Sequence, residues 1–152
     1  MFRGITHLNI DTKGRLAMPS RYRDAITSES AGQMVVTVDH TDKCLLIYPM
    51  KDWVKVEEQL MRLNNMNRRA RNVQRLILGH ASECELDSQG RILVPAPLRS
   101  YAGLQKKTTL VGQLNKFELW DSENYVAQRD IWIAEAQEDD FEADEALSQV
   151  SI

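Results

Sequence analysis

The chain has 152 residues, of which 43% are hydrophobic and 27% are charged. This length allows one ordinary domain or two small ones, and the hydrophobic share is sufficient for a buried core. No apolar run approaches the roughly eighteen residues of a membrane-spanning helix, and the first ten residues lack the pattern of a secretory signal. We therefore expect a cytoplasmic protein with no membrane partner. Cys44 and Cys84 lie far apart without a nearby second cysteine, which argues against a disulfide framework or a zinc site and predicts buried thiols. We expect no cofactor.

The charge is unevenly distributed along the chain, although its net value is only −3. Residues 1–120 contain 18 Lys and Arg against 12 Asp and Glu, a net charge of +6, whereas residues 121–152 contain one Arg against ten acids, a net charge of −9. Residues 61–81 carry five arginines and no acid. Such a patch suits phosphate binding, and a solvated helix face is the alternative interpretation.

The first 48 residues predict a unit of two strands, a helix and two more strands. Apolar residues alternate on both sides of a short polar segment, at Leu8, Ile10, Leu16 and Met18. This pattern is typical of two short strands joined by a tight turn, in which Gly14 supplies a positive φ and Asp11 accepts backbone N–H groups. Pro19 ends the second strand and begins a short helix. Further strands are predicted at residues 34–38 and 45–48.

The second half of the chain repeats this unit. The segment DTKGRLAMP, residues 11–19, recurs as DSQGRILVP, residues 87–95. The same offset aligns Arg23 with Arg99, and a smaller offset aligns residues 45–48 with 117–120, so four residues are missing from the second copy, in the loop equivalent to residues 28–32. Residues 96–102 predict a short helix, followed by strands at 108–111 and 116–120. One internal duplication indicates two homologous units and not a solenoid.

Helices are predicted between and after the repeats. Residues 49–64 have the apolar spacing of an amphipathic helix, and a second helix begins after Asn67 as its cap and ends near Gly79. A third helix begins near Asp121, and beyond about Glu138 the acidic chain is expected to be frayed or disordered. The expected organisation is a first repeat at 1–53, linking helices at 54–80, a second repeat at 81–125, and a C-terminal helix with an acidic, partly disordered tail at 126–152.

Each repeat is too small to bury its own sheet comfortably. Because no metal or disulfide is indicated, the two repeats are expected to share one core, with hairpins that interleave within the chain. The apolar faces of the linking helices can then pack against neighbouring chains, which predicts a homo-oligomer.

Each repeat contains D-x-x-G-R, three apolar residues and a proline, with an arginine four positions after the proline. This motif resembles the AbrB-type swapped-hairpin DNA-binding domain. Two copies, with LILGHASECELD between them and the segments MFRG, CLLIYP and VGQLNKFELWD around them, are similar to the MraZ family of transcriptional regulators, from Met1 to about Tyr125. The resemblance implies a mainly β, α+β fold. In that fold, two β-β-α-β-β repeats form a double swapped-hairpin β-barrel with linking helices.

The same resemblance implies a sequence-specific DNA-binding regulator that is not an enzyme. Members of the family bind double-stranded promoter DNA at short direct repeats upstream of the division and cell wall gene cluster, whose first gene encodes the family member itself. In some bacteria they repress that operon. They assemble as closed homo-oligomeric rings and associate with the nucleoid.

The duplicated arginines of the family motif fall on Arg15 and Arg91. A guanidinium at a hairpin tip can bond guanine O6 and N7 in the major groove, or two phosphate oxygens. Lys13 would add a phosphate contact. The alternative is that each arginine pairs with the aspartate of its own turn, Asp11 or Asp87, and stiffens it; both can hold together. Four further candidate DNA-binding residues are Arg23 and Arg99, which could instead brace the short helices, and Arg3 and Arg21. Pro97 stands where the first repeat has Arg21 and is expected to interrupt the second short helix. The second repeat therefore presents fewer cations near its hairpin.

Other classes of function have weaker support. The three histidines, His7, His40 and His80, share no metal-ligand spacing and no acid partner, which disfavours an enzyme. Aromatic stacking on single-stranded RNA would use Tyr48, Trp53 and Trp120, but their positions beside strand ends favour packing. A structural or scaffolding homo-oligomer without DNA readout is the main alternative, and it should lack salt-dependent DNA retention. We also hypothesise that the acidic tail competes with DNA for the basic surface.

Overall fold

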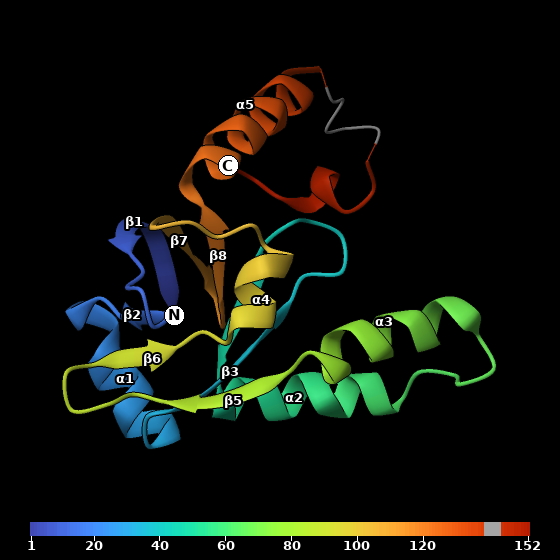
Figure 1. Ribbon diagram of the computed structural model, residues 1–152. Coiled ribbons are helices and arrows are strands. Elements are labelled where there is room, and N and C mark those ends of the chain that lie inside the picture. Colours follow the sequence, from blue (N-terminus) through green and yellow to red (C-terminus); the bar gives the residue numbers. More distant parts are fainter. Residues whose placement is uncertain (139–143) are drawn as a thin grey trace. The chain divides into compact units, whose positions relative to one another are not determined.

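The computed structural model describes residues 1–138 and 144–152, which form two compact units, Met1–Ser122 and Glu123–Ile152 (Figure 1). In chain order the elements are β1 (Phe2–Asn9), β2 (Arg15–Ala17), α1 (Ser20–Ser30), β3 (Gln33–Val38), β4 (Leu45–Pro49), α2 (Met50–Met61), α3 (Arg68–Gly79), β5 (Ser82–Glu85), β6 (Arg91–Leu93), α4 (Ala96–Tyr101), β7 (Lys107–Leu114), β8 (Phe117–Asp121), α5 (Ser122–Glu138) and the short 3-10 helix η1 (Leu147–Gln149). All eight strands, β1 to β8, lie in the first unit.

The strands form two antiparallel sheets. A six-stranded sheet has the order β1-β7-β8-β4-β3-β5, and β2 pairs with β6 in a separate two-stranded sheet. In the larger sheet, β1 pairs with β7 along all eight of its residues, and β3 pairs with both β4 and β5. The α+β fold class, built from two repeats, is confirmed. The described ladders leave the six-stranded sheet open at β1 and β5.

The two strands that flank each tight turn do not pair with each other, as they would in a simple hairpin. The first arm of the first repeat, β1, pairs with β7 of the second repeat, and its second arm, β2, pairs with β6. In the second repeat, the arm β5 pairs with β3 of the first repeat. Alternating apolar residues specify which face of a strand is buried and not which strand lies beside it. The exchange of partners is the interleaving expected of swapped hairpins.

The core is shared between the repeats, as expected. Its fully buried side chains come from both halves of the chain and include Leu16, Ile26, Met34, Ile47, Ile92, Leu110, Phe117 and Leu119. The rings of Phe2 and Phe117 stack with centroids 4.3 Å apart, and Tyr22 meets Phe2 edge to face. Because neither repeat contributes all of this cluster, neither can bury its sheet alone.

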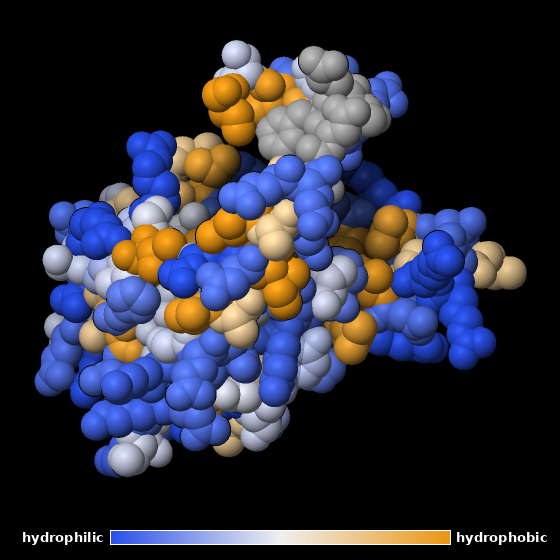
Figure 2. All heavy atoms as spheres, turned by 90° about the horizontal axis from the view of Figure 1, so that it is seen from above, coloured by the Kyte–Doolittle hydropathy of each residue, from blue (hydrophilic) through white to orange (hydrophobic). Residues whose placement is uncertain are grey.

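The linking helices are confirmed, with the predicted cap. The Asn67 side chain accepts hydrogen bonds from the backbone N–H groups of Arg69 at 2.9 Å and Ala70 at 3.3 Å, and α3 ends at Gly79. A second buried cluster lies where α2 and α3 cover the sheet and contains Val35, Leu46, Tyr48, Trp53, Leu60 and Ile77. The far end of this helix pair, at the right in Figure 1, is mostly hydrophilic in Figure 2.

The prediction that Pro97 interrupts the second short helix is wrong. Helix α4 begins at Ala96 and contains Pro97 in its first turn, where a backbone N–H has no acceptor within the helix and its loss has little cost. The four-residue difference between the repeats lies mainly in α1, which continues to Ser30, whereas α4 ends at Tyr101.

The C-terminal helix α5 confirms the third predicted helix. The expectation of a disordered acidic tail falls partly on residues 139–143, which lie outside the described residues, and residues 144–152 contain η1. Among the described helices, none combines the length and the apolar character needed to cross a lipid bilayer.

Candidate nucleic-acid interface

The first Asp-x-x-Gly-Arg turn is held together by the aspartate carboxylate. Oδ1 of Asp11 accepts the backbone N–H groups of Lys13 at 2.9 Å and Arg15 at 2.8 Å, and Oδ2 accepts Nε–H of Arg15 at 2.7 Å. The Gly14 N–H donates to the Asp11 carbonyl at 3.0 Å, and Gly14 adopts φ +88°. This geometry explains the sequence pattern, because only glycine adopts that φ readily and only a short carboxylate reaches three donors.

The second turn has the same arrangement. The Asp87 carboxylate accepts the backbone N–H groups of Gln89 and Arg91, each at 2.9 Å, and Nε–H of Arg91 at 2.8 Å. The Arg15 backbone N–H, followed by the Arg15 side chain, lowers the pKa of Asp11 to about 2. The Arg91 backbone N–H is the main cause of the lowered pKa of Asp87. Both aspartates are therefore ionised at neutral pH.

The pairing of β2 with β6 brings the two arginines onto one surface. Arg15 lies opposite Leu93, and Arg91 lies opposite Ala17, while the alternate residues of both strands point into the core. Positions two apart along a strand share a face, so Arg15 and Arg91 are diagonal neighbours, with Cα atoms about 7–8 Å apart. Their side chains are 35% and 27% exposed. The outer face of this two-stranded sheet thus carries one motif arginine from each repeat.

The intraturn ion pairs leave most of each guanidinium available. Each arginine uses Nε for its aspartate, and among the described residues nothing accepts a hydrogen bond from the Nη atoms of Arg15 or Arg91. The Nη atoms carry four of the five N–H donors of a guanidinium. Pairing with the aspartate therefore fixes the position of the arginine and leaves the N–H donors of its Nη atoms available to a ligand.

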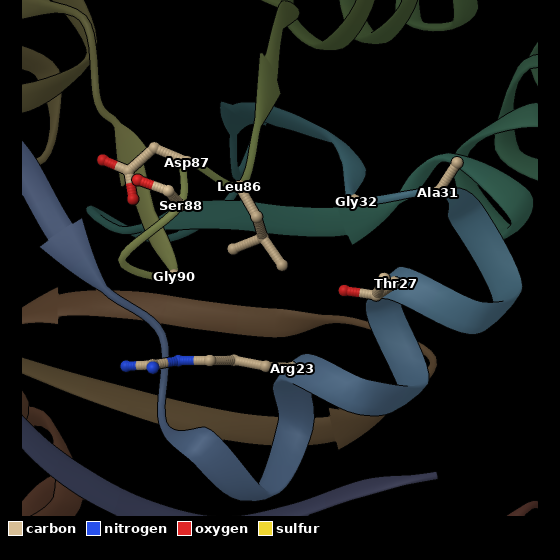
Figure 3. A pocket seen from close by; sticks show the side chains of 8 residues that line it. All are labelled: Arg23, Thr27, Ala31, Gly32, Leu86, Asp87, Ser88 and Gly90. Carbon is tan, nitrogen blue, oxygen red and sulfur yellow. The ribbon is translucent and has the colours of Figure 1, made fainter.

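Arg23 and Arg99 each support the turn of the opposite repeat. Arg23 extends from α1 toward the turn that holds Gly90, and its Nε donates to the Met18 carbonyl at 2.7 Å (Figure 3). A Cβ atom added at Gly90 would lie 2.5 Å from Cζ of Arg23, and one added at Gly14 would lie 2.9 Å from Cζ of Arg99. The glycines thus also make room for an arginine of the other repeat. Both arginines therefore have a packing role, but it lies at the turn of the other repeat and not at their own short helix, where the sequence suggested it.

The remaining predicted cations occupy two places. Lys13 is exposed in the first turn, whereas the second turn has Gln89 at that position. Arg21 donates to Thr6 Oγ1 at 2.6 Å and lies over the Tyr22 ring, 4.6 Å from its centroid. Arg3 is exposed on β1, and its carbonyl accepts the Tyr22 hydroxyl. Among the described residues, neither Arg3 nor Arg21 forms a hydrogen bond or an ion pair with the turn arginines.

Sequence reasoning missed Lys106. Its carbonyl accepts the Ile10 backbone N–H at 2.9 Å, which places the start of β7 beside the first turn. The lysine is exposed and, among the described residues, forms no ion pair. No local signal in the sequence could have identified it, because the two segments are brought together by pairing between repeats.

The aromatic side chains considered for RNA stacking are buried. Trp53 is 5%, Trp120 2% and Tyr48 6% exposed. The tilted rings of Tyr48 and Trp53 pack with centroids 5.6 Å apart. Their preferred interpretation as packing residues is confirmed, because a base cannot stack on a ring that is covered by protein.

One cluster of possible metal ligands occurs among the described residues. The ligand atoms of Asp39, Cys44 and Glu118 lie within 4.8 Å of one another. Burial, followed by the charge of Glu118, raises the pKa of the Cys44 thiol, so the sulfur remains protonated and lies 3.8 Å from Oδ2 of Asp39 as a weak donor. Metal binding requires the thiolate. A protonated thiol beside two carboxyl groups is therefore better described as a hydrogen-bonded cluster.

Comparisons with known proteins agree with the duplicated turn. The MraZ protein family, described as antitoxin-like, matches residues 1–76 and again residues 77–149. Over 138 residues the chain is 58% identical to Transcriptional regulator MraZ of Thioalkalivibrio sulfidiphilus, with 91% of each chain covered. It is 50% identical to the protein of that name from Alkalilimnicola ehrlichii over 91% of this chain and 93% of the relative, and 55% identical to that from Yersinia pestis over 84% of each. The duplication, the matched turns and these identities show that the chain belongs to the MraZ family.

Proposed function

We propose that the chain is a sequence-specific, DNA-binding transcriptional regulator that contacts double-stranded promoter DNA through the outer face of the β2–β6 pair. The observation that carries this proposal is the pair of equivalent turns, which hold Arg15 and Arg91 side by side. Their Nη atoms have no hydrogen-bond partner within residues 1–138 and 144–152. Arginine forks fixed in this way suit guanine edges and phosphate oxygens. The relatives named as transcriptional regulators support the same class of function.

The proposed site residues have different roles. Arg15 and Arg91 reach base edges or phosphates, and Lys13 binds a phosphate beside the first turn. Arg23 and Arg99 act mainly as positioning residues, because their guanidinium groups pack against Gly90 and Gly14. A second group, Arg3 and Arg21, contacts phosphates farther along the DNA. The first repeat carries more exposed cations than the second, so it should contribute more of the affinity.

We further propose that several copies act together in a closed homo-oligomeric ring. A single turn offers few contacts, and a ring that presents several turns to equally spaced direct repeats makes later contacts intramolecular. The open sheet edges β1 and β5 are available for contacts between copies. In this proposal, the protein is cytoplasmic, associates with the nucleoid, and represses its own operon together with the division and cell wall gene cluster.

The direct experiment is a gel-shift titration on the upstream region of the gene at two salt concentrations. Wild type is compared with Arg15→Ala, Arg91→Ala and Arg15→Lys. Arg129→Ala is the control, because Arg129 is exposed and, in the part of the chain that the structure describes, pairs only with its neighbour Asp130. We expect Arg15→Ala to cost about 1–3 kcal/mol of binding free energy. Arg15→Lys should retain phosphate attraction and lose base preference, because lysine lacks the planar fork.

The oligomeric size of each variant is measured by light scattering, so that a loss of assembly is not mistaken for a loss of contact. The proposal is supported if Arg15→Ala weakens retardation without changing the oligomeric size, and if Arg129→Ala binds the fragment like wild type. If wild type does not retard the fragment, or if all variants bind alike, a structural or scaffolding homo-oligomer becomes the better interpretation.

A further inference from the structure

We propose that a pocket beside the first turn binds a phosphate group. The pocket has a volume of about 540 Å³, within the range typical of small-molecule sites. It is lined by both repeats, chiefly by Ile10, Asp11, Thr12, Arg99, Leu104 and Lys106. We call it the Arg99 pocket.

The first argument is an unsatisfied donor. Nε of Arg99 is buried, and no atom of the described residues accepts a hydrogen bond from it. Its counterpart in the first repeat, Nε of Arg23, donates to the Met18 carbonyl at 2.7 Å. The Arg99 guanidinium is also packed directly against Gly14. Arg99 also forms no ion pair among the described residues, so the positive charge of its guanidinium is not compensated there. A charge in this position is unfavourable, and an anion in the cavity that Arg99 lines would compensate it.

The second argument is that Lys106 adds another positive charge to the pocket, whose walls are held in place by backbone hydrogen bonds. Lys106 lines the same pocket and has no acidic partner among the described residues. The Ile10 N–H donates to the Lys106 carbonyl at 2.9 Å, and the Leu104 N–H donates to the Arg99 carbonyl at 2.9 Å. These backbone bonds hold the walls in place before any ligand arrives. An arginine and a lysine on one cavity are a common combination for phosphate binding.

The acidic residue in the wall does not oppose this assignment. Both carboxylate oxygens of Asp11 are engaged by N–H donors of its own turn, including Nε of Arg15. Its charge is therefore compensated within the turn. Arg99 and Lys106 remain as the positive charges that face the cavity, while Ile10 and Leu104 provide apolar surface for the rest of a small ligand.

The equivalent depression beside the second turn is different. It has a volume of about 370 Å³ and contains Arg23, Thr27 and Asp87 but no lysine (Figure 3). Because the Nε donor of Arg23 is already satisfied, this depression offers no comparable reason for an external acceptor. The proposal therefore concerns the first turn alone.

The phosphate group could belong to a small free molecule or to the DNA backbone. The second source rests on the proposed DNA binding, whereas the first does not. Calorimetric titrations of the full chain without DNA use glycerol 3-phosphate and inorganic phosphate, with glycerol as the control that lacks the charged group. We expect Lys106→Gln to weaken glycerol 3-phosphate binding at least tenfold, and Arg99→Gln to abolish it.

Lys107→Gln is the matched control. Lys107 is the exposed neighbour, loses the same charge, and lines a different depression together with His7 and Thr108. It should bind glycerol 3-phosphate like wild type. Lys106→Gln is the decisive variant because its exposed side chain braces no turn, whereas Arg99→Gln also removes packing against Gly14.

A parallel gel-shift series distinguishes the two sources. Glycerol 3-phosphate binding that requires Lys106 indicates a free phosphate ligand. A backbone phosphate is indicated by two results together. The small phosphates do not bind, and the slope of DNA affinity against salt concentration falls by about one phosphate contact in Lys106→Gln but not in Lys107→Gln. Either result supports a phosphate site. The proposal is overturned if neither titration depends on Lys106, or if Lys107→Gln weakens binding as much as Lys106→Gln.

Discussion

Replacing Gly14 by alanine should destabilise the protein by about 3 kcal/mol. Gly14 has φ +88°, a conformation that costs an L-residue about 1–2 kcal/mol. The new Cβ would also lie 2.7 Å from the Val94 carbonyl oxygen and 2.9 Å from Cζ of Arg99. The carbonyl belongs to the backbone that crosses from the other repeat, where the Val94 N–H donates to the Gly14 carbonyl at 2.8 Å, so it cannot move without weakening that bond.

The assay is urea unfolding followed by circular dichroism, at one fixed protein concentration because assembly contributes to apparent stability. The midpoint of thermal unfolding should fall by roughly 5–15 °C. Gly79→Ala is the control, because Gly79 is helical and a Cβ there would meet no atom of the described residues within 4 Å. That change should leave stability unaltered or raise it by up to about 1 kcal/mol. Equal effects of the two substitutions would refute the argument that the turn requires glycine.

Three further predictions concern single side chains. Asn67→Ala should cost about 1 kcal/mol in the same urea assay, because it removes the cap of α3. Burial raises the pKa of Glu118, so the ionised carboxylate destabilises the folded state. Glu118→Gln should therefore raise the melting temperature at pH 7. This gain should disappear as the pH falls below the pKa of the unfolded chain, near 4.5. An unchanged melting temperature at pH 7 would contradict this. By carbon-13 NMR, Asp11 should titrate near 2, so its contribution to stability is present above its ordinary pKa of 3.8 and is lost as the pH falls toward 2. Arg15→Ala should raise that pKa only part of the way to 3.8, since the main cause is the backbone N–H of residue 15; full reversion to 3.8 would be evidence against that cause.

Several elements could be predicted from the sequence because the interactions that form them are local. The Asp-x-x-Gly turn closes through bonds between residues at most four apart, and the Asn67 cap reaches two and three residues ahead. Helix α2 and strand β4 were also predicted close to their observed bounds. Short-range hydrogen bonds and hydrophobic periodicity suffice for such features. The candidate arginines, Arg15 and Arg91, followed from the same repeated motif.

The tertiary structure decided which segments meet. Alternating apolar residues gave no indication that β1 pairs with β7, or that β2 and β6 pair and thereby place Arg15 beside Arg91. The packing of Arg99 against Gly14, its unsatisfied Nε and the approach of Lys106 also arise between the repeats. These contacts join residues that are far apart along the chain, so they depend on burial of one shared core and not on any local pattern. The sequence by itself determined two equal turns, and the shared core determined that they lie side by side on one surface.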